Sequence, residues 1–352
     1  MTQARFDAGD LRAYVSALLR KVGLPATPAE VVAEGLVEAD LLGHSTHGLA
    51  LLSDYVAEIK AGTMTTAGRP EVLTSLGAVA TWDARRLPGI WTTVLAIEEA
   101  TKRAAALGLG AVAIRRSHHI ACLASFLEAP ARQGFLVLVF SSDPVESHVA
   151  PFGAVTPVLM PDPIAAGIPD RPDPILIDIS TSITTMAMSG RMRREGRRLP
   201  GNWLRDAAGN PTDDPTHVGK GTTLLPVGGA DHGHKGYALG LLVEALTQGL
   251  SGFGRRDKPE GWGAAVMVLA INPAAFGSLD GFIDQVAFLS DACRAAKPIP
   301  GGHPVRLPGE AGLARKRTAL RQGIELRADI LAELIELSTT HSVPLPMAKT
   351  AD

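Results

Sequence analysis

The chain has 352 residues, of which 46% are hydrophobic and 20% charged, and its 34 Lys and Arg nearly balance its 36 Asp and Glu to a net charge of -2. That length predicts roughly two domains with a sizeable core, which excludes a disordered chain and a small disulfide-stapled scaffold. The near-neutral balance gives no reason to expect nucleic acid or an anionic membrane as a partner. Two cysteines and the absence of an apolar leader or an 18-residue apolar stretch predict a cytoplasmic protein.

The first sixty residues predict three helices. Apolar residues recur at helical spacing over 11–22, and Gly and Pro then end that segment. A capping box with proline at the first helical position begins a second helix at Thr27, which we expect to run to Gly43. A third helix is expected over 45–62, with Ser45 or Thr46 as its cap.

From about residue 78, short apolar runs alternate with helical ones. The expected strands are 79–82, 110–114, 135–140, 175–179 and 264–271, and the expected helices are 91–107, a segment after residue 119, and 237–250. Two Pro- and Gly-rich segments, 151–173 and 189–215, are expected to be long functional or mobile loops.

Helical periodicity returns after residue 310. The elements therefore predict an α/β protein in which an N-terminal helical segment, 1–77, packs with C-terminal helices, 311–352, beside a central sheet domain, 78–310. Neither GxGxxG after a strand nor a Walker A loop is present, so a nucleotide would have to bind on another fold.

The segment Gly43–Gly48 reads GHSTHG at an expected helix N-terminus. Free backbone N–H groups and the helix dipole favour an anion there, and the dipole disfavours the imidazolium form of a histidine. A capped helix with two surface histidines is an equally good reading of this segment.

The segment Ser117–His119 lies in an expected strand-to-helix loop, where α/β proteins place reactive groups. A histidine at this place suits a general acid/base, although a core or capping histidine is the ordinary alternative. Since adjacent side chains point in different directions, at most one of the two histidines is expected to be catalytic.

Two further clusters carry positive charge. Lys235, at the start of the expected helix, suits a phosphate group. Five arginines within 191–198 are either a solvated loop or a cover over a polyphosphate. Three pairs of histidines, 44 with 47, 118 with 119 and 232 with 234, leave open a zinc-dependent hydrolase as an alternative.

Seven segments taken together resemble one known family. They are EADLLGHSTHGLALLSDY (38–55), RRSHHIACLASF (115–126), SSDP (141–144) with APFGA (150–154), DISTS (178–182), LPGNWLRDAAGNPTDDP (199–215), HGHKGYALGLLVEALTQGLSG (232–252) and LPGE (307–310). Their order and spacing are similar to those of the malate/L-lactate dehydrogenases of the non-Rossmann type, a family that includes sulfolactate, ureidoglycolate and hydroxycarboxylate dehydrogenases and cyclic imino-acid reductases.

The resemblance implies an oxidoreductase that uses NAD or NADP, with a largely antiparallel central sheet flanked by helices, acting on a small-molecule substrate as a homodimer. It assigns proton transfer to His119, with His47 as a second catalytic residue. The implied substrate contacts are Thr46, His47, Leu51 and Tyr55, and the implied cofactor contacts are Ser142, Asp178, Ile179, Ser180, His234 and Lys235.

Two departures from the family pattern bear on the substrate. Many members have an arginine where this chain has Leu51, and Asp162 replaces an asparagine and is expected to add negative charge. We therefore expect a 2-oxo or 2-hydroxy monocarboxylate with an apolar tail, held at the helix N-terminus of Thr46 and His47, unless Arg115 or Arg116 replaces the missing clamp. A cyclic imino-acid reductase and a non-catalytic ligand-binding member remain alternatives.

Overall fold

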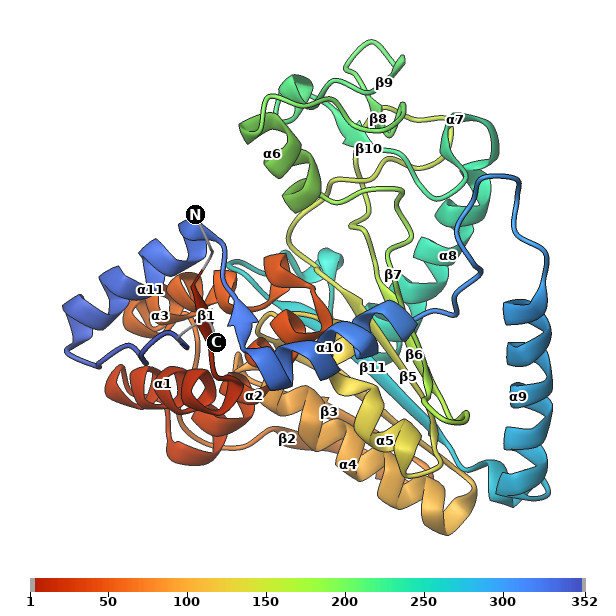
Figure 1. Cartoon of the computed structure of the whole chain (residues 1–352), viewed down its shortest axis with the longest axis horizontal. Helices are drawn as coiled ribbons and strands as arrows, with labels where there is room; N and C mark the ends of the chain where they lie inside the picture. Colours follow the sequence, from red (N-terminus) through yellow and green to blue (C-terminus); the bar gives the residue numbers. More distant parts are fainter. Residues whose placement is uncertain (1–3, 350–352) are drawn as a thin grey trace.

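The computed structural model describes residues 4–349, and a seven-stranded sheet forms its centre (Figure 1). The strand order is β2-β3-β4-β11-β5-β6-β7. These strands are β2 (Glu71–Leu76), β3 (Val79–Asp83), β4 (Leu109–Ser117), β5 (Leu136–Ser142), β6 (Ile164–Ile168), β7 (Ile175–Ile179) and β11 (Ala264–Ile271). Every neighbouring pair is antiparallel except β3 with β4, so the expected largely antiparallel, non-Rossmann α/β fold is confirmed.

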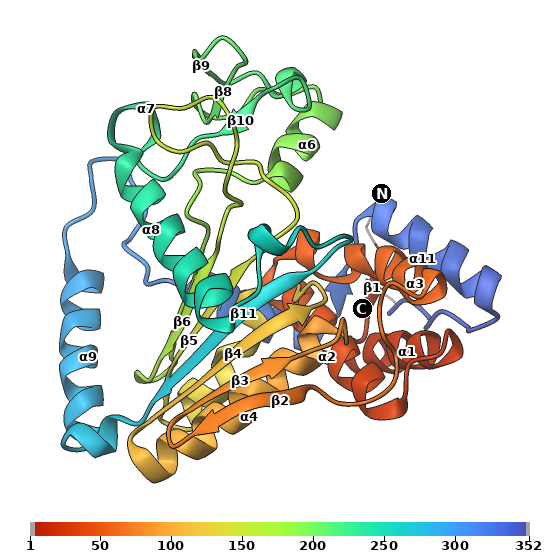
Figure 2. The same ribbon diagram turned by 180° about the vertical axis from the view of Figure 1, so that it is seen from behind.

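Helices cover both faces of this sheet because its central strands are apolar on both sides. Val112 and Ile114 of β4 belong to the large core shared with α4 (Gly89–Leu107). Ala111 and Ala113, which point the other way, pack in a second cluster with Val243 of α8 (His234–Glu244). Figure 2 shows α4 and α8 on opposite sides of the sheet.

The two ends of the chain pack into one helical body beside the sheet (Figure 1). This body contains α1 (Ala8–Lys21), α2 (Ala26–Leu42), α3 (Leu52–Ala61), α10 (Glu310–Gln322) and α11 (Ala328–His341). Strand β1 (Arg5–Phe6) pairs with β12 (Ile324–Glu325), and the Tyr14 hydroxyl donates to the Leu334 carbonyl at 2.9 Å. The predicted packing of the helical ends is therefore confirmed, and the domain boundaries at 77 and 310 stay a prediction.

A smaller lobe lies above one end of the sheet (Figures 1 and 2). It contains α6 (Met186–Arg194), α7 (Gly229–His232) and a small sheet of β8 (Leu204–Arg205), β9 (Pro211–Thr212) and β10 (Thr223–Leu224). Its own core includes Val149, Leu159 and Leu224. The remaining helices are α5 (Glu128–Arg132), below the sheet, and α9 (Leu279–Ala295), which stands at its outer edge.

Two expected helix starts are wrong. Helix α2 begins at Ala26, before Thr27, and no side chain caps it, so the predicted capping box does not form. The segment predicted as a helix from residue 45 is two 3₁₀ turns, Ser45–His47 and Leu49–Leu51, and α3 begins only at Leu52. Gly48 is not helical between the turns (φ -106°, ψ -132°), and the Leu49 N–H donates to the half-buried Asp40 carboxylate at 2.7 Å instead of to a helical carbonyl.

The two segments predicted as long loops contain regular structure. Strand β6 lies within 151–173, where flanking prolines made a short buried strand resemble a loop, and α6 with β8 and β9 occupies much of 189–215. Helix α8 starts three residues before the predicted position and ends in a π-helical turn, Ala245–Gly249. After the paired histidines the chain forms a 3₁₀ turn, Leu123–Phe126, and the short α5, in place of one longer helix.

Candidate active site

A cavity of about 450 Å³ opens where the helical body, the end of the central sheet and the small lobe meet. Five of the predicted site residues line it: His47, His119, Ser142, Asp178 and Ser180. They come from a 3₁₀ turn, the segment after β4, the end of β5 and the end of β7. The sequence therefore identified residues that the fold brings together from segments far apart in the chain.

The paired histidines follow directly from β4, which ends at Ser117. The backbone of α4 approaches them so closely that a Cβ on Gly89 would lie 2.1 Å from the His118 carbonyl oxygen and 2.4 Å from that of His119. Glycine is therefore required at the start of α4. The Ser117 hydroxyl also donates to the His118 carbonyl at 2.9 Å, which fixes the turn that presents His119 to the cavity.

The imidazole of His119 is held from two sides. Its Nδ1 lies 3.1 Å from the hydroxyl of Tyr55 and accepts the Ala121 N–H at 3.3 Å. Because a backbone N–H can only donate, Nδ1 is an acceptor in the neutral ring and the proton is on Nε2. The indole of Trp262 stacks on the ring, with centroids 4.2 Å apart and planes at 23°.

Burial, followed by the neighbouring His47 and His118, lowers the pKa of His119 well below its ordinary value. The ring is therefore neutral at physiological pH before a ligand binds. A carboxylate placed beside it would raise its pKa, because an opposite charge favours the imidazolium form. His119 thus has the contacts and the environment of a group that exchanges a proton with a bound molecule.

His118 is not equivalent to its neighbour. Its ring is fully buried, and its Nε2 lies 3.1 Å from the Glu58 carboxylate of α3. Burial lowers the pKa of His118 to about 4 despite the opposing effect of Glu58. Only one of the pair faces the cavity, in agreement with the sequence-based expectation.

The first predicted cluster contributes differently from the expectation. Thr46 does not line the cavity. Its hydroxyl lies 3.0 Å from Nδ1 of His47 and orients that ring. The rings of His47 and His119 are stacked, with centroids 6.2 Å apart. Since α3 begins at Leu52, no α-helix N-terminus points at a ligand from Thr46 and His47. The predicted helix-terminus site for a carboxylate is therefore wrong.

Other predicted substrate contacts also lie elsewhere. Leu51 is packed against the large core and does not line the cavity, and Tyr55 lies beneath His119 as a fully buried support. Arg115 and Arg116 both contact the buried carboxylate of Asp83, at 2.9 Å and 2.6 Å, and neither replaces the missing clamp. Among the described lining residues, the basic side chains are the imidazoles of four histidines, and none is Arg or Lys.

The predicted cofactor residues occupy two adjoining segments. Val227, which precedes α7 and α8 in the chain, connects the turn after β7 to the start of α8. Its N–H donates to the Thr181 carbonyl at 2.8 Å, and its carbonyl accepts the Gly236 N–H at 3.0 Å. A Cβ at Gly236 would lie 2.6 Å from the Thr181 oxygen, so this close packing requires glycine. His234 and Lys235 are exposed at the first turn of α8, and Ile179 points to solvent.

The arginine run lies away from the cavity. Thr185 and Met186, at the start of α6, line the cavity, whereas Arg191, Arg193 and Arg194 are in its last turn. Arg197 pairs with Glu195 and Arg198 with Asp213. These contacts favour the solvated-loop alternative over a cover on a polyphosphate.

The hydroxyl of Ser142 is held in the cavity wall by a π-helical turn. Its hydroxyl lies 2.7 Å from the Thr247 hydroxyl and accepts the Gln248 side-chain N–H at 3.0 Å. Both partners belong to the turn Ala245–Gly249 that extends α8. π-Helical turns occur frequently at functional sites because they redirect side chains that a regular helix would place elsewhere.

Asp162 lies in the wall of the cavity, and its charge differs from the expected one. It is fully buried, and neither carboxylate oxygen has a hydrogen-bond partner among the described residues. Burial, with the nearby Glu244, raises the pKa of Asp162 to about 9. The expected extra negative charge is therefore absent at neutral pH, because desolvation keeps the group protonated.

Comparison with known proteins agrees with this geometry. A sequence profile of malate/L-lactate dehydrogenases matches residues 6–335. A (2R)-3-sulfolactate dehydrogenase (NADP(+)) from Chromohalobacter salexigens is 34% identical over 331 residues, which cover 90% of this chain and 93% of that protein.

Two solved structures have the same fold over almost their whole length. Malate dehydrogenase from Entamoeba histolytica superposes with a TM-score of 0.92 at 25% identity and covers 98% of this chain and 100% of its own. Delta1-piperideine-2-carboxylate reductase from Pseudomonas syringae superposes with a TM-score of 0.80 at 27% identity, covering 95% and 99%.

The protonated state of Asp162 predicts a pH-dependent stability difference. Between the unfolded pKa near 3.8 and the folded pKa of about 9, the folded chain holds a proton that the unfolded chain releases, so stability falls as pH rises through this range. We expect Asp162→Asn to raise the free energy of unfolding by about 1–3 kcal/mol at pH 8 and by less at pH 5. Urea-induced unfolding at the two pH values measures this difference.

Asp173→Asn is the matched control, because Arg132 lowers the pKa of Asp173 and its loss should destabilise the protein at pH 8. Equal stability of wild type and Asp162→Asn at both pH values would contradict a protonated Asp162.

Proposed function

Because the chain belongs to the malate/L-lactate dehydrogenase family, we propose that it transfers a hydride between NAD or NADP and a small 2-oxo or 2-hydroxy acid with one carboxylate. Members of this family are NAD(P)-dependent dehydrogenases of hydroxy acids. The observation that carries the proposal is His119, a buried imidazole fixed by Tyr55 and Trp262 at the wall of a cavity that also contains Ser142 and the turn after β7.

His119 exchanges the proton of the reaction. A bound nicotinamide would supply the hydride for the carbonyl carbon; in the reducing direction Nε2 of a protonated His119 gives its proton to the carbonyl oxygen. In the oxidising direction the neutral ring accepts the hydroxyl proton at Nε2. The lowered pKa of His119 makes the free enzyme ready for the oxidising direction, and the substrate carboxylate favours protonation for the reducing one.

Tyr55 and Trp262 support both states of this histidine. The Tyr55 hydroxyl lies 3.1 Å from Nδ1 and 3.2 Å from the His119 carbonyl, so it can donate to the neutral ring and turn to the carbonyl when Nδ1 becomes protonated. The face of Trp262 at 4.2 Å stabilises an imidazolium by cation–π attraction. Tyr55 is thus a positioning residue here, not a substrate contact.

The adjoining segments around Ser180 and Lys235 fit a nicotinamide dinucleotide. The tight backbone packing at Gly236 places the exposed side chains of His234 and Lys235, in the first turn of α8, beside the turn after β7. A diphosphate suits such a helix start. Asp178, Ser180 and Ser142 would then hold the rest of the cofactor along the cavity toward His119.

The charges of the cavity favour a single carboxylate on the substrate. Asp143 and Asp178 line it, whereas an arginine clamp is absent from the described lining. His44 and His47 are the groups placed to meet one carboxylate, and a second one would have no cationic partner. The preference for a monocarboxylate with an apolar tail therefore rests on the cavity as a whole and no longer on Leu51.

A cyclic imino acid is the second candidate substrate. The Pseudomonas syringae reductase has the same fold over 95% of this chain, and reduction of a C=N bond needs the same hydride and proton transfers. The zinc-hydrolase alternative is not retained, since the family is one of dehydrogenases.

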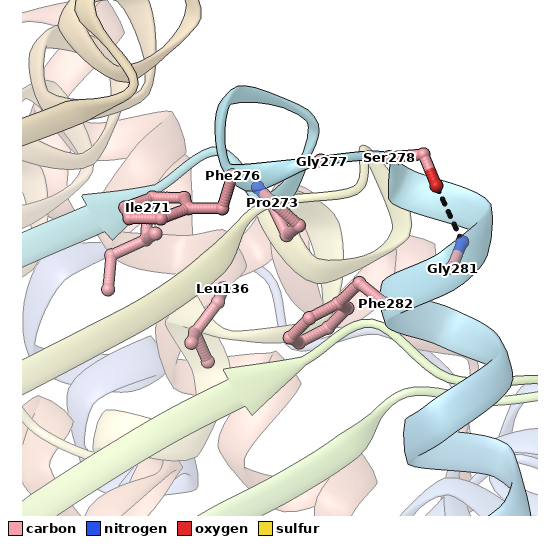
Figure 3. Close-up of a pocket in the computed structure, with 8 residues that line it drawn as sticks. All are labelled: Leu136, Ile271, Pro273, Phe276, Gly277, Ser278, Gly281 and Phe282. Atoms are coloured by element: carbon pink, nitrogen blue, oxygen red, sulfur yellow. Dashed lines mark hydrogen bonds between the residues drawn. The ribbon is translucent and has the colours of Figure 1, made fainter.

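We also propose that two copies associate through α9 and its flanking segments. Of the 17 residues of α9, only Ser290 is buried, and Phe276 and Phe288 are each 76% exposed. An apolar hollow of about 500 Å³ lies beside it. The hollow is lined by Leu136, Phe276 and Phe282, among others, and by no ionisable side chain (Figure 3). Exposed apolar surface of this extent marks a protein interface, which supports the homodimer implied by the family resemblance.

Among residues 4–349, none of the helices combines the length and the apolar character needed to cross a bilayer. A small molecule is the partner that the cavity supports.

Replacing His119 tests the chemistry. General acid/base groups contribute about 10²–10⁴-fold, so we expect His119→Ala to lower kcat by that factor while the Kd for NADH or NADPH stays within about two-fold. A larger loss of kcat in His47→Ala than in His119→Ala would transfer the role to His47.

In the wild type, kcat/KM for hydroxy-acid oxidation should stay on its plateau below pH 6.5, because the base of the free enzyme has a lowered pKa.

Replacing Lys235 tests the cofactor site. Lys235→Ala removes an exposed cation from the proposed phosphate site. It should therefore raise the cofactor KM several-fold and leave the substrate KM nearly unchanged. Lys21→Ala, which removes an exposed lysine at the end of α1, is the charge-matched control. Steady-state kinetics with NADH and NADPH in parallel would also show the cofactor preference, and equal behaviour of the two variants would remove Lys235 from the site.

Introducing a charge into the α9 surface tests the dimer. Phe288→Glu should give monomers in light scattering after gel filtration, since burying an unpaired carboxylate in an interface is unfavourable. Ile335→Glu, at a half-exposed position of α11, should leave the dimer intact. A monomeric wild type at micromolar concentration would contradict the proposal.

A further inference from the structure

Three side chains of different chemistry meet in the wall of the cavity. The ligand atoms of His44, Cys122 and Asp178 (an imidazole nitrogen, the thiol sulfur and a carboxylate oxygen) all lie within 4.8 Å of one another. They come from the turn before Ser45, the segment after β4 and the end of β7. The group differs from each of the histidine pairs that the sequence suggested as zinc ligands.

The geometry of this group is fixed on two sides and adjustable on the third. The Asp178 carboxylate accepts the Ala124 N–H at 2.8 Å and lies 3.7 Å from the Cys122 sulfur, which is buried. The His44 ring is exposed, so it can turn toward them without disturbing the core. His44 and Asp178 also line a second cavity of about 280 Å³, so an ion can reach the group from two sides.

One nitrogen, one sulfur and one carboxylate oxygen form a donor set that selects soft or borderline divalent cations. Zn²⁺ accepts all three ligand types and commonly has three protein ligands with a fourth, open position. Mg²⁺ and Ca²⁺ prefer sets made of oxygen alone. Closing three ligand atoms around Zn²⁺ requires movements of about 1 Å, given bond lengths of about 2.0–2.3 Å.

We propose that His44, Cys122 and Asp178 bind one Zn²⁺ ion, and that this ion inhibits the enzyme by occupying part of the cofactor's place. Binding breaks the S–H bond of Cys122, whose proton leaves to solvent as the sulfur–zinc bond forms, with no change of oxidation state. The inhibitory role rests on the proposed function because Asp178 is a proposed cofactor contact. The binding of zinc itself does not.

Titration calorimetry of the metal-free protein with Zn²⁺ tests the site directly. We expect one ion per chain, no binding of Mg²⁺, and a loss of about 100-fold or more in affinity in Cys122→Ser, since a direct ligand matters at least as much as an outer-shell partner. His44→Gln, at an exposed position, should weaken binding in the same direction without a risk to folding. Co²⁺ should give a thiolate charge-transfer band that Cys122→Ser abolishes.

Two variants control for adventitious binding. Cys293→Ser removes the other free cysteine, and His232→Gln disrupts the surface histidine pair near α8, so both should bind Zn²⁺ as the wild type does. Equal zinc affinity in wild type, Cys122→Ser and His44→Gln would overturn the proposed site.

Competition with NADH separates the two proposals. Zn²⁺ should raise the apparent Kd for NADH in the wild type and leave it unchanged in His44→Gln. If the protein binds Zn²⁺ through Cys122 but binds neither NADH nor NADPH, the metal site is retained and the proposed dehydrogenase function is refuted. Simultaneous, independent binding of both ligands would overturn the inhibitory role.

Discussion

The hydrogen bond between the Tyr55 hydroxyl and His119 joins the two main parts of the molecule at the candidate active site. Tyr55 belongs to the helical body built from both ends of the chain, whereas His119 is delivered by the central strand β4. The contact forms only when α3 is packed at the end of the sheet and the backbone of α4 is close enough to hold the His118–His119 turn. Folding of the whole core is therefore a condition for the position of one imidazole.

The sequence predicted the residues whose position depends on local segments and missed those that depend on packing. His119, Ser142 and Asp178 lie at ends of strands that their apolar pattern predicts, so their convergence follows from the sheet. Trp262 was not identified, because a tryptophan before a strand is ordinarily part of a core, and its stacking on His119 depends on tertiary structure. The neutral state of Asp162 likewise depends on burial, which no residue spacing encodes.

The fold shows the same limit. The antiparallel sheet and the packed ends agree with the sequence, yet the pattern around β6 predicts a loop, since a proline flanks the strand on each side and a glycine lies within it. The helix expected at Ser45 fails because Asp40 captures the Leu49 N–H, a contact between residues nine positions apart. Without that helix the expected anion site is absent, and Leu51 packs half-buried against the large core.

Helix α8 spans the distance between the two functional ends of the site. Lys235 lies in its first turn, and the π-helical turn that continues it holds the Ser142 hydroxyl through Thr247 and Gln248. Leu241 and Leu242 on the same helix are exposed. A packed helix moves as a stiff rod, so a displacement of its outer leucines would shift both Lys235 and the turn that holds Ser142.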